Sequence, residues 1–454
     1  MAERGGTPVL AVVLGGLILA WPAAWNGYPL VFADTGTYLG QALLLYLGWD
    51  RPATYSVFAH ALHWRLTLWT IPVVQGLVTA HLLSLVLRTL GRPGARAVLL
   101  ACGLLALATG LPFLVAQVMP DLFTTLVVLA LWLLGFGWER LGRWERWYVL
   151  LLATAGIAFH LSHVPLAAGL AIVAGAVTWV ARGAPPALGA AGRMAAPLGV
   201  AMLALVALNA AGHGRLSLSP FGSVFMAARL IDDGPGLRTM DARCEEAGWQ
   251  VCAWRAQLPM GFNHFLWEPD APLARMGGGK AWGAEASDIV RETLAREPGA
   301  VVAETLRNAW RQFVWFGTGD GLEPWRGVPG PEPLIVRFFP GELGAFRESR
   351  QYAGLLQPEA RALSPLHVAL GWLGLALLPA AAWLRRRDLP ALALCLMVLA
   401  ASLGNALVTG GLSGVNERYQ GRIAWLFPFA VAAVLASGRV PRTVRDARGA
   451  TVNA

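Results

Sequence analysis

The stretch 389–409, LPALALCLMVLAASLGNALVT, decides the fold class of this chain of 454 residues. It contains no charged side chain over 21 residues. A helix needs about 20 residues, at about 1.5 Å each, to cross roughly 30 Å of hydrocarbon. A stretch of this length and composition therefore predicts a membrane-spanning helix.

Nine other apolar stretches resemble it, which predicts ten spans in all: 7–25, 67–87, 97–115, 122–138, 147–160, 164–181, 194–211, 366–384 and 423–438 complete the set. Only the residues HLSH (160–163) separate the fifth span from the sixth, so these two could form one kinked segment. The first stretch is longer than the apolar region of a typical signal peptide, and PAA (22–24) is a weak cleavage site, so we expect it to remain uncleaved.

The composition agrees with a membrane protein. Hydrophobic residues make up 56% of the chain and charged residues 14%, whereas soluble domains average about 25% charged residues. The mean hydropathy is +0.53. A soluble enzyme, a disordered protein and a fibrous protein are excluded, and we predict an all-α polytopic membrane protein.

The net charge of +9 follows the predicted topology. With the N-terminus inside, the predicted cytoplasmic segments hold 16 arginines and five acidic residues, while the short outer loops balance at zero. Basic residues accumulate in cytoplasmic loops of membrane proteins. We therefore attribute the basic character to orientation in a bacterial-type inner membrane and expect no nucleic-acid partner.

This topology divides the chain into four parts. We expect a seven-span block at 1–212 with a first outer loop at 26–66, a mostly helical extracytoplasmic domain at 213–365, a three-span block at 366–438, and a basic cytoplasmic tail at 439–454. Within 213–365, residues 285–296 and 299–316 have helical periodicity and are separated at Pro298. The second of these helices carries Trp310 and Trp315, so it either lies on the membrane surface or packs inside the domain.

Cysteine usage indicates an oxidising compartment for this domain. Cys244 and Cys252 both lie in it, separated by seven residues, which predicts a disulfide. Two free thiols are the alternative, and a zinc site is less favoured because no further ligand lies nearby. Cys102 and Cys395 fall inside predicted spans, where they fill space in the core.

Polar residues with chemical potential lie in the predicted outer loops. Asp34 follows the first span, where it could cap a helix or act as a general base. Asp121 follows Pro120 at a helix start, a favourable place for negative charge. His160 and His163 have a spacing that could ligate a metal or hydrogen-bond a substrate.

Arg418 and Arg422 lie in the last predicted outer loop, contrary to the positive-inside trend, so a local interaction should account for their position. Lipid phosphate or an acidic partner such as Asp34 would provide it, and snorkelling towards headgroups is the simpler alternative.

Taken together, the Asp34 loop with Tyr38, Asp121 after the third span and Arg418-Tyr419 near the end resemble polytopic glycosyltransferases of the GT-C type, which use polyprenyl-phosphate-linked sugars. The resemblance covers about 1–165 and, more loosely, 365–438. It implies Asp34 as the catalytic base, Asp121 as a second acid that positions acceptor or metal, and Arg418 and Arg422 as ligands of the donor phosphate. A single acid, Asp34, follows the first span where the family commonly has a tandem acidic pair, so no cofactor is assigned beyond a possible divalent cation.

We therefore predict an inverting glycosyltransferase that transfers sugar to an acceptor on the outer face. The predicted catalytic residues are Asp34 and Asp121, and the predicted substrate-binding residues are Tyr38, Arg51, Tyr55, His160, His163, Arg418, Tyr419 and Arg422. Expected partners are membrane lipids, the lipid-linked donor and an acceptor. A carrier or flippase for a lipid-linked or amphipathic solute is the alternative function, and an assembly subunit is a third.

Overall fold

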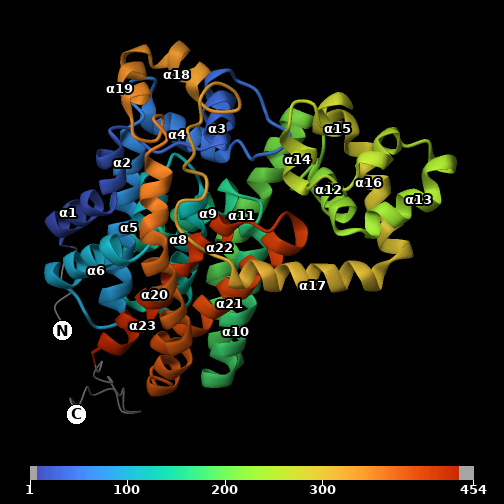
Figure 1. The fold of residues 1–454 in the computed structure, drawn as a ribbon. Helices are drawn as coiled ribbons and strands as arrows, with labels where there is room; N and C mark the ends of the chain where they lie inside the picture. Colours follow the sequence, from blue (N-terminus) through green and yellow to red (C-terminus); the bar gives the residue numbers. More distant parts are fainter. Residues whose placement is uncertain (1–7, 439–454) are drawn as a thin grey trace.

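The computed structural model describes residues 8–438, so the predicted basic tail at 439–454 lies outside the described residues. Within 8–438 the regular secondary structure is helical, apart from one isolated bridge that pairs Leu30 with Gln117 (Figure 1). The prediction of an all-α fold is confirmed.

Seven helices are long and apolar enough to cross a membrane: α5 (Thr70–Thr89), α8 with its continuation to Arg140 (Asp121–Arg140), α10 (His163–Arg182), α11 (Ala184–His213), α20 (Leu356–Leu384), α21 (Leu389–Leu412), and the pair α22 and α23 (Glu417–Ala436). α8 itself, Asp121–Trp132, is buried at every residue and belongs to the main core of the bundle. The chain is thus an integral membrane protein with several candidate spans.

The other three predicted spans correspond to shorter helices. The first is α1 (Val9–Leu19) followed by α2 (Trp21–Asn26), the third is α6 (Ala95–Ala108) followed by α7 (Leu111–Ala116), and the fifth is α9 (Arg143–Phe159). At about 1.5 Å per residue, α1 alone covers only about 17 Å. α1 packs closely on α5, because a Cβ on Gly76 would lie 2.3 Å from the carbonyl oxygen of Gly16.

Many of the predicted cytoplasmic arginines gather at one end of the bundle. Arg92 donates to the Ala436 carbonyl and Arg140 to the Thr89 carbonyl. Arg385 donates to the carbonyls of Leu435 and Ser437, at 3.1 and 2.8 Å. These bonds satisfy carbonyls that the ends of α5 and α23 leave without intrahelical partners.

The segment 213–365 packs in two parts. The first, which we call the side lobe (residues 221–296), contains α12 (Gly222–Asp233), α13 (Pro235–Ala247), η3 (Gln250–Gln257), α14 (Phe262–Trp267), α15 (Pro272–Arg275) and α16 (Gly278–Arg296) around its own core. Figure 1 shows it beside the bundle. Trp49 of the first loop packs against this core and stacks on Phe225 and Trp267.

The second part covers the first loop, which contains α3 (Ala33–Leu43) and α4 (Thr54–His63). It consists of α18 (Glu332–Phe338), η4 (Pro340–Glu342) and α19 (Leu343–Glu348), whose apolar residues join the main core of the bundle. Between the two parts, α17 (Pro298–Val314) runs across the direction of α10 and α20 (Figure 1). The break at Pro298 matches the prediction.

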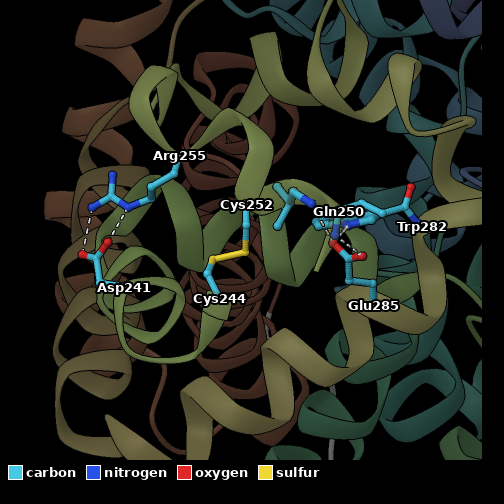
Figure 2. Close-up of a disulfide and its surroundings, with 8 residues drawn as sticks. Asp241, Cys244, Gln250, Cys252, Arg255, Trp282 and Glu285 are labelled. Carbon is cyan, nitrogen blue, oxygen red and sulfur yellow. Dashed lines mark hydrogen bonds and ion pairs between the residues drawn. A yellow bond between two sulfur atoms is a disulfide. The ribbon is translucent and has the colours of Figure 1, made fainter. Parts of the chain in front are cut away.

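The predicted disulfide is present in the side lobe. Cys244 of α13 bonds Cys252 of η3, with their Cα atoms 5.9 Å apart (Figure 2). Beside it, Glu285 accepts hydrogen bonds from the backbone N–H groups of Gln250 and Val251 and from the Trp282 indole. Cys102 and Cys395 are free and buried in apolar helices, as expected.

Candidate functional site

Asp34 lies in the first turn of α3, where a carboxylate complements the helix dipole. At this N-terminus the Phe32 N–H donates a hydrogen bond to Thr35 Oγ1, and the Asp34 carboxylate has a different partner. That partner is Arg51, whose Nε and Nη2 each lie 2.9 Å from Asp34 Oδ2. Both side chains are only about one-seventh exposed.

The environment of this first pair favours charge on the arginine. Burial lowers the pKa of Arg51, but Asp34 and Asp50 outweigh it and hold the pKa above its ordinary value. Asp50 lies within 4.0 Å of Arg51, and burial raises the pKa of its carboxyl group. Arg51 therefore lies within salt-bridge distance of two carboxylates of the first loop, those of Asp34 and Asp50.

Asp121 and Arg422 form a second pair at the junction of α8 and α22 (Glu417–Ala424). Arg422 Nη1 donates to Asp121 Oδ1 at 2.9 Å. Its Nη2 donates to Asn405 Oδ1 at 2.9 Å and to Ser162 Oγ at 3.3 Å. The Arg422 side chain is 0% exposed, so snorkelling to headgroups does not describe this residue.

Arg418 connects the two pairs. Its Nη2 lies 4.0 Å from Asp34 Oδ2, and its Nη1 lies 3.8 Å from Asp121 Oδ2. The guanidinium sits 4.0 Å above the ring centre of Phe32 and 5.1 Å from that of Tyr419. Arg418 Nη1 and Arg422 Nε both lack a hydrogen-bond partner within residues 8–438, but Arg422 makes three side-chain hydrogen bonds whereas the carboxylate contacts of Arg418 are long, so Arg418 is held more loosely.

Two tyrosines of the first loop lie close to these pairs. Tyr55 donates to Gln75 Oε1 at 3.0 Å, while the buried Tyr38 hydroxyl finds no partner in the described part of the chain. Their rings contact edge to face, with centres 5.0 Å apart. Burial raises the pKa of Tyr38 well above its ordinary value although Arg51 opposes it, so this hydroxyl remains a proton donor.

The two histidines occupy different positions relative to the cluster. His160 contacts Ser162 Oγ at 2.8 Å, and this serine accepts from Arg422. His163 is fully buried, with Nδ1 2.6 Å from the Gly156 carbonyl and Nε2 2.8 Å from Thr124 Oγ1. Because both its ring nitrogens contact protein atoms, His163 joins α8, α9 and α10 and is poorly placed for a metal.

Among residues 8–438, no group of three or more His, Cys, Asp or Glu side chains is arranged to hold a metal ion. The charges at the site are instead balanced by arginines. We call these six residues the charged cluster: Asp34, Asp50, Arg51, Asp121, Arg418 and Arg422.

Sequence reasoning missed several neighbours of this cluster. Asp320 accepts from the Arg418 backbone N–H at 3.2 Å, and Trp267 of the side lobe lies 5.3 Å from the Arg51 guanidinium. Asn405 lies inside a stretch predicted as a span, and Asp50, next to Arg51, was not among the predicted site residues. An uncharged polar residue within an apolar stretch was the available indication for Asn405.

The fold and site define an all-α integral membrane protein with a buried charged cluster where the first loop, α8 and α22 meet. No family model, no curated protein and no solved structure matches this chain.

Proposed function

We propose that this protein is an inverting membrane glycosyltransferase that moves a sugar from a polyprenyl-phosphate carrier to an acceptor hydroxyl on the outer face. The observation that supports it is the charged cluster itself, in which residues far apart in sequence meet as linked ion pairs. Buried charges are costly, so such a cluster favours a functional role over a purely structural one.

In this mechanism Asp34 accepts the proton of the acceptor hydroxyl as its oxygen attacks the anomeric carbon. The bond from that carbon to the lipid phosphate oxygen breaks on the opposite face, which inverts the configuration. The leaving phosphate is already ionised and takes no proton. Arg51 would orient the Asp34 carboxylate through its two contacts at 2.9 Å.

The contacts of Arg418 and Arg422 favour different roles for these two arginines. Arg418 is the better ligand for the donor phosphate, because its carboxylate contacts of 3.8 and 4.0 Å are long and its Nη1 lacks a described hydrogen-bond partner. Arg422, with three polar partners, would position Asp121. The Tyr38 hydroxyl is available to donate to a phosphate or sugar oxygen.

The proposal includes ten spans in a bacterial-type inner membrane, with α1, α6 and α9 as short or tilted spans and with residues 213–365 outside the cytoplasm. The arginine-rich end of the bundle and the disulfide support this orientation. Reporter fusions after Gly236 and after Arg387 should give opposite signals. Equal signals at the two positions would overturn the topology.

Sugar transfer and donor affinity, measured on the same purified variants, test the mechanism. Asp34→Asn keeps the size of the side chain but cannot accept the proton, so turnover should fall about 10²–10⁴-fold while donor affinity changes little. Arg418→Ala should weaken donor binding as well as rate, because a charged hydrogen bond contributes about 1.5–3 kcal/mol.

The matched control is Asp241→Asn, which removes an exposed carboxylate paired with Arg255 in the side lobe and should leave transfer unchanged. Near wild-type transfer by the Asp34→Asn protein would remove Asp34 from the mechanism. A wild-type protein that moves the lipid-linked sugar across liposomes without cleaving it would instead identify a carrier.

A further inference from the structure

Helix α17 has its side chains arranged in an unusual way for a helix of a folded lobe. Its buried positions include polar residues, namely Asn308 and Gln312. Its large apolar side chains are exposed: Val302 is 58% exposed, Leu306 59% and Trp310 64%. Helices that cover a protein core show the opposite pattern.

The two buried polar residues of α17 are hydrogen-bonded to other parts of the protein. The Asn308 amide donates to both carboxylate oxygens of Asp233, at 3.0 and 3.1 Å. Gln312 exchanges two hydrogen bonds with the backbone of Asn416, at 2.8 and 2.9 Å. The helix also touches the end of α21, where a Cβ on Gly410 would lie 2.6 Å from the Asn308 carbonyl oxygen. This packing fixes how α17 is rotated about its axis.

At about 100° per residue, the packed positions 301, 305, 308 and 312 point in one direction. The apolar positions 302, 306, 310 and 313 point roughly 125° away, and the exposed arginines at 307 and 311 point roughly 130° further round. α17 therefore has three faces: one against the protein, one apolar, and a basic face with Arg307 and Arg311, where Glu304 pairs with Arg307.

We propose that the apolar face of α17 lies in the interface of the bilayer that the chain spans, with its basic face towards lipid phosphates and water. A helix parallel to a membrane carries an apolar face with Trp, Phe and Leu and a polar face rich in Arg and Lys. α17 runs across the direction of the candidate spans α10 and α20 (Figure 1). The span on which it rests, α21, exposes Leu403, Leu407 and Leu412, so the two elements present apolar side chains to the same lipid.

This placement sets the depth of the charged cluster. Gln312 holds the backbone of Asn416, two residues before Arg418, and the chain after α17 leads to Asp320, which accepts the Arg418 N–H. α17 therefore lies at the level of the headgroups and connects directly to the residues at the start of α22. The lipid contact of α17 does not depend on sugar transfer.

Site-directed spin labelling in nanodiscs made of phosphatidylethanolamine and phosphatidylglycerol tests the proposal. Cys102→Ala and Cys395→Ala remove the free thiols, and Leu306→Cys, Trp310→Cys and Arg307→Cys then carry the label one at a time. We expect labels at 306 and 310 to collide more with oxygen than with a water-soluble nickel chelate, and the label at 307 to show the reverse order.

Arg307→Cys is the matched control, because it adjoins Leu306 on the same helix. Equal nickel accessibility at 306 and 307 would overturn the proposal. Protection of 306 and 310 from both reagents, with dipolar broadening between labelled molecules, would also overturn it, because a second copy of the chain would then cover this face.

Discussion

The Asp121–Arg422 pair of the charged cluster and the Asp241–Arg255 pair of the side lobe differ in burial. In the cluster, Arg422 and Asp121 are buried and pair across 301 residues of sequence. In the side lobe, Asp241 and Arg255 pair across 14 residues on the surface beside the disulfide, with side chains 52% and 39% exposed (Figure 2). The side lobe keeps its core apolar, around the buried Trp282.

The two pairs therefore differ in what they contribute to stability. An exposed ion pair contributes about 0–1 kcal/mol because water screens it. A buried pair carries a large desolvation cost, and apolar residues of similar volume often serve stability as well or better. The exposed Asp241–Arg255 pair can therefore be removed at little cost, whereas the cluster retains charges that packing alone does not require.

The largest effect on stability is expected for Arg422→Ala. It leaves Asp121 buried without its closest partner, which should lower the free energy of unfolding by about 3–5 kcal/mol. Adding Asp121→Asn should restore part of the loss, because the uncompensated charge is then gone. Denaturant unfolding of the purified protein in detergent measures both variants.

Arg255→Ala is the control from the side lobe, with an expected change within about 1 kcal/mol. Similar losses for Arg255→Ala and Arg422→Ala would remove the contrast between the two regions.

An intermediate effect is expected for the disulfide. Replacing Cys244 and Cys252 with Ser removes a cross-link that closes a short loop, which the chain-entropy model values at about 2–3 kcal/mol. Proteolysis of the side lobe should accelerate, while the charged cluster keeps its geometry and donor affinity stays unchanged. Peptide mapping without reductant checks the bond first, and full alkylation of both native thiols would contradict it.

A pH-dependent effect is expected for His63, a buried ionisable group at the end of α4. Burial, together with nearby His60 and Arg65, lowers its pKa to about 4, and its ring packs against Phe339. The unfolded chain binds a proton near pH 6.5, so the folded state should lose stability as the pH falls from about 6.5 to about 4.

His63→Gln removes the group that binds this proton, so the melting temperature should depend less on pH between about pH 6.5 and about pH 4. His264→Gln is the control, since His264 lies exposed on α14 of the side lobe. An unchanged slope for His63→Gln would show that other groups cause the acid sensitivity.

The elements that follow from short-range patterns were predicted from the sequence. Long apolar stretches gave α5, α8, α10, α11, α20 and α21 to within a few residues at most ends, and Pro298 separated α16 from α17. The pairing of Cys244 with Cys252 needed only their spacing and shared segment. Seven of the ten predicted spans correspond to helices long enough to cross a membrane, and the prediction did not include the helix breaks at Ala20 and at Thr109–Gly110, because hydropathy does not register them.

For the candidate site, the sequence by itself determined which residues to examine. An acid after the first span, an acid at the start of α8 and two arginines against the positive-inside trend stand out by their position along the chain. Tertiary structure decided which carboxylate each arginine meets, that Arg422 is buried while Arg418 is held loosely, and that α17 turns its apolar face outward. The physical reason is that hydropathy and helical period act over a few turns, whereas burial and charge pairing depend on contacts between segments hundreds of residues apart.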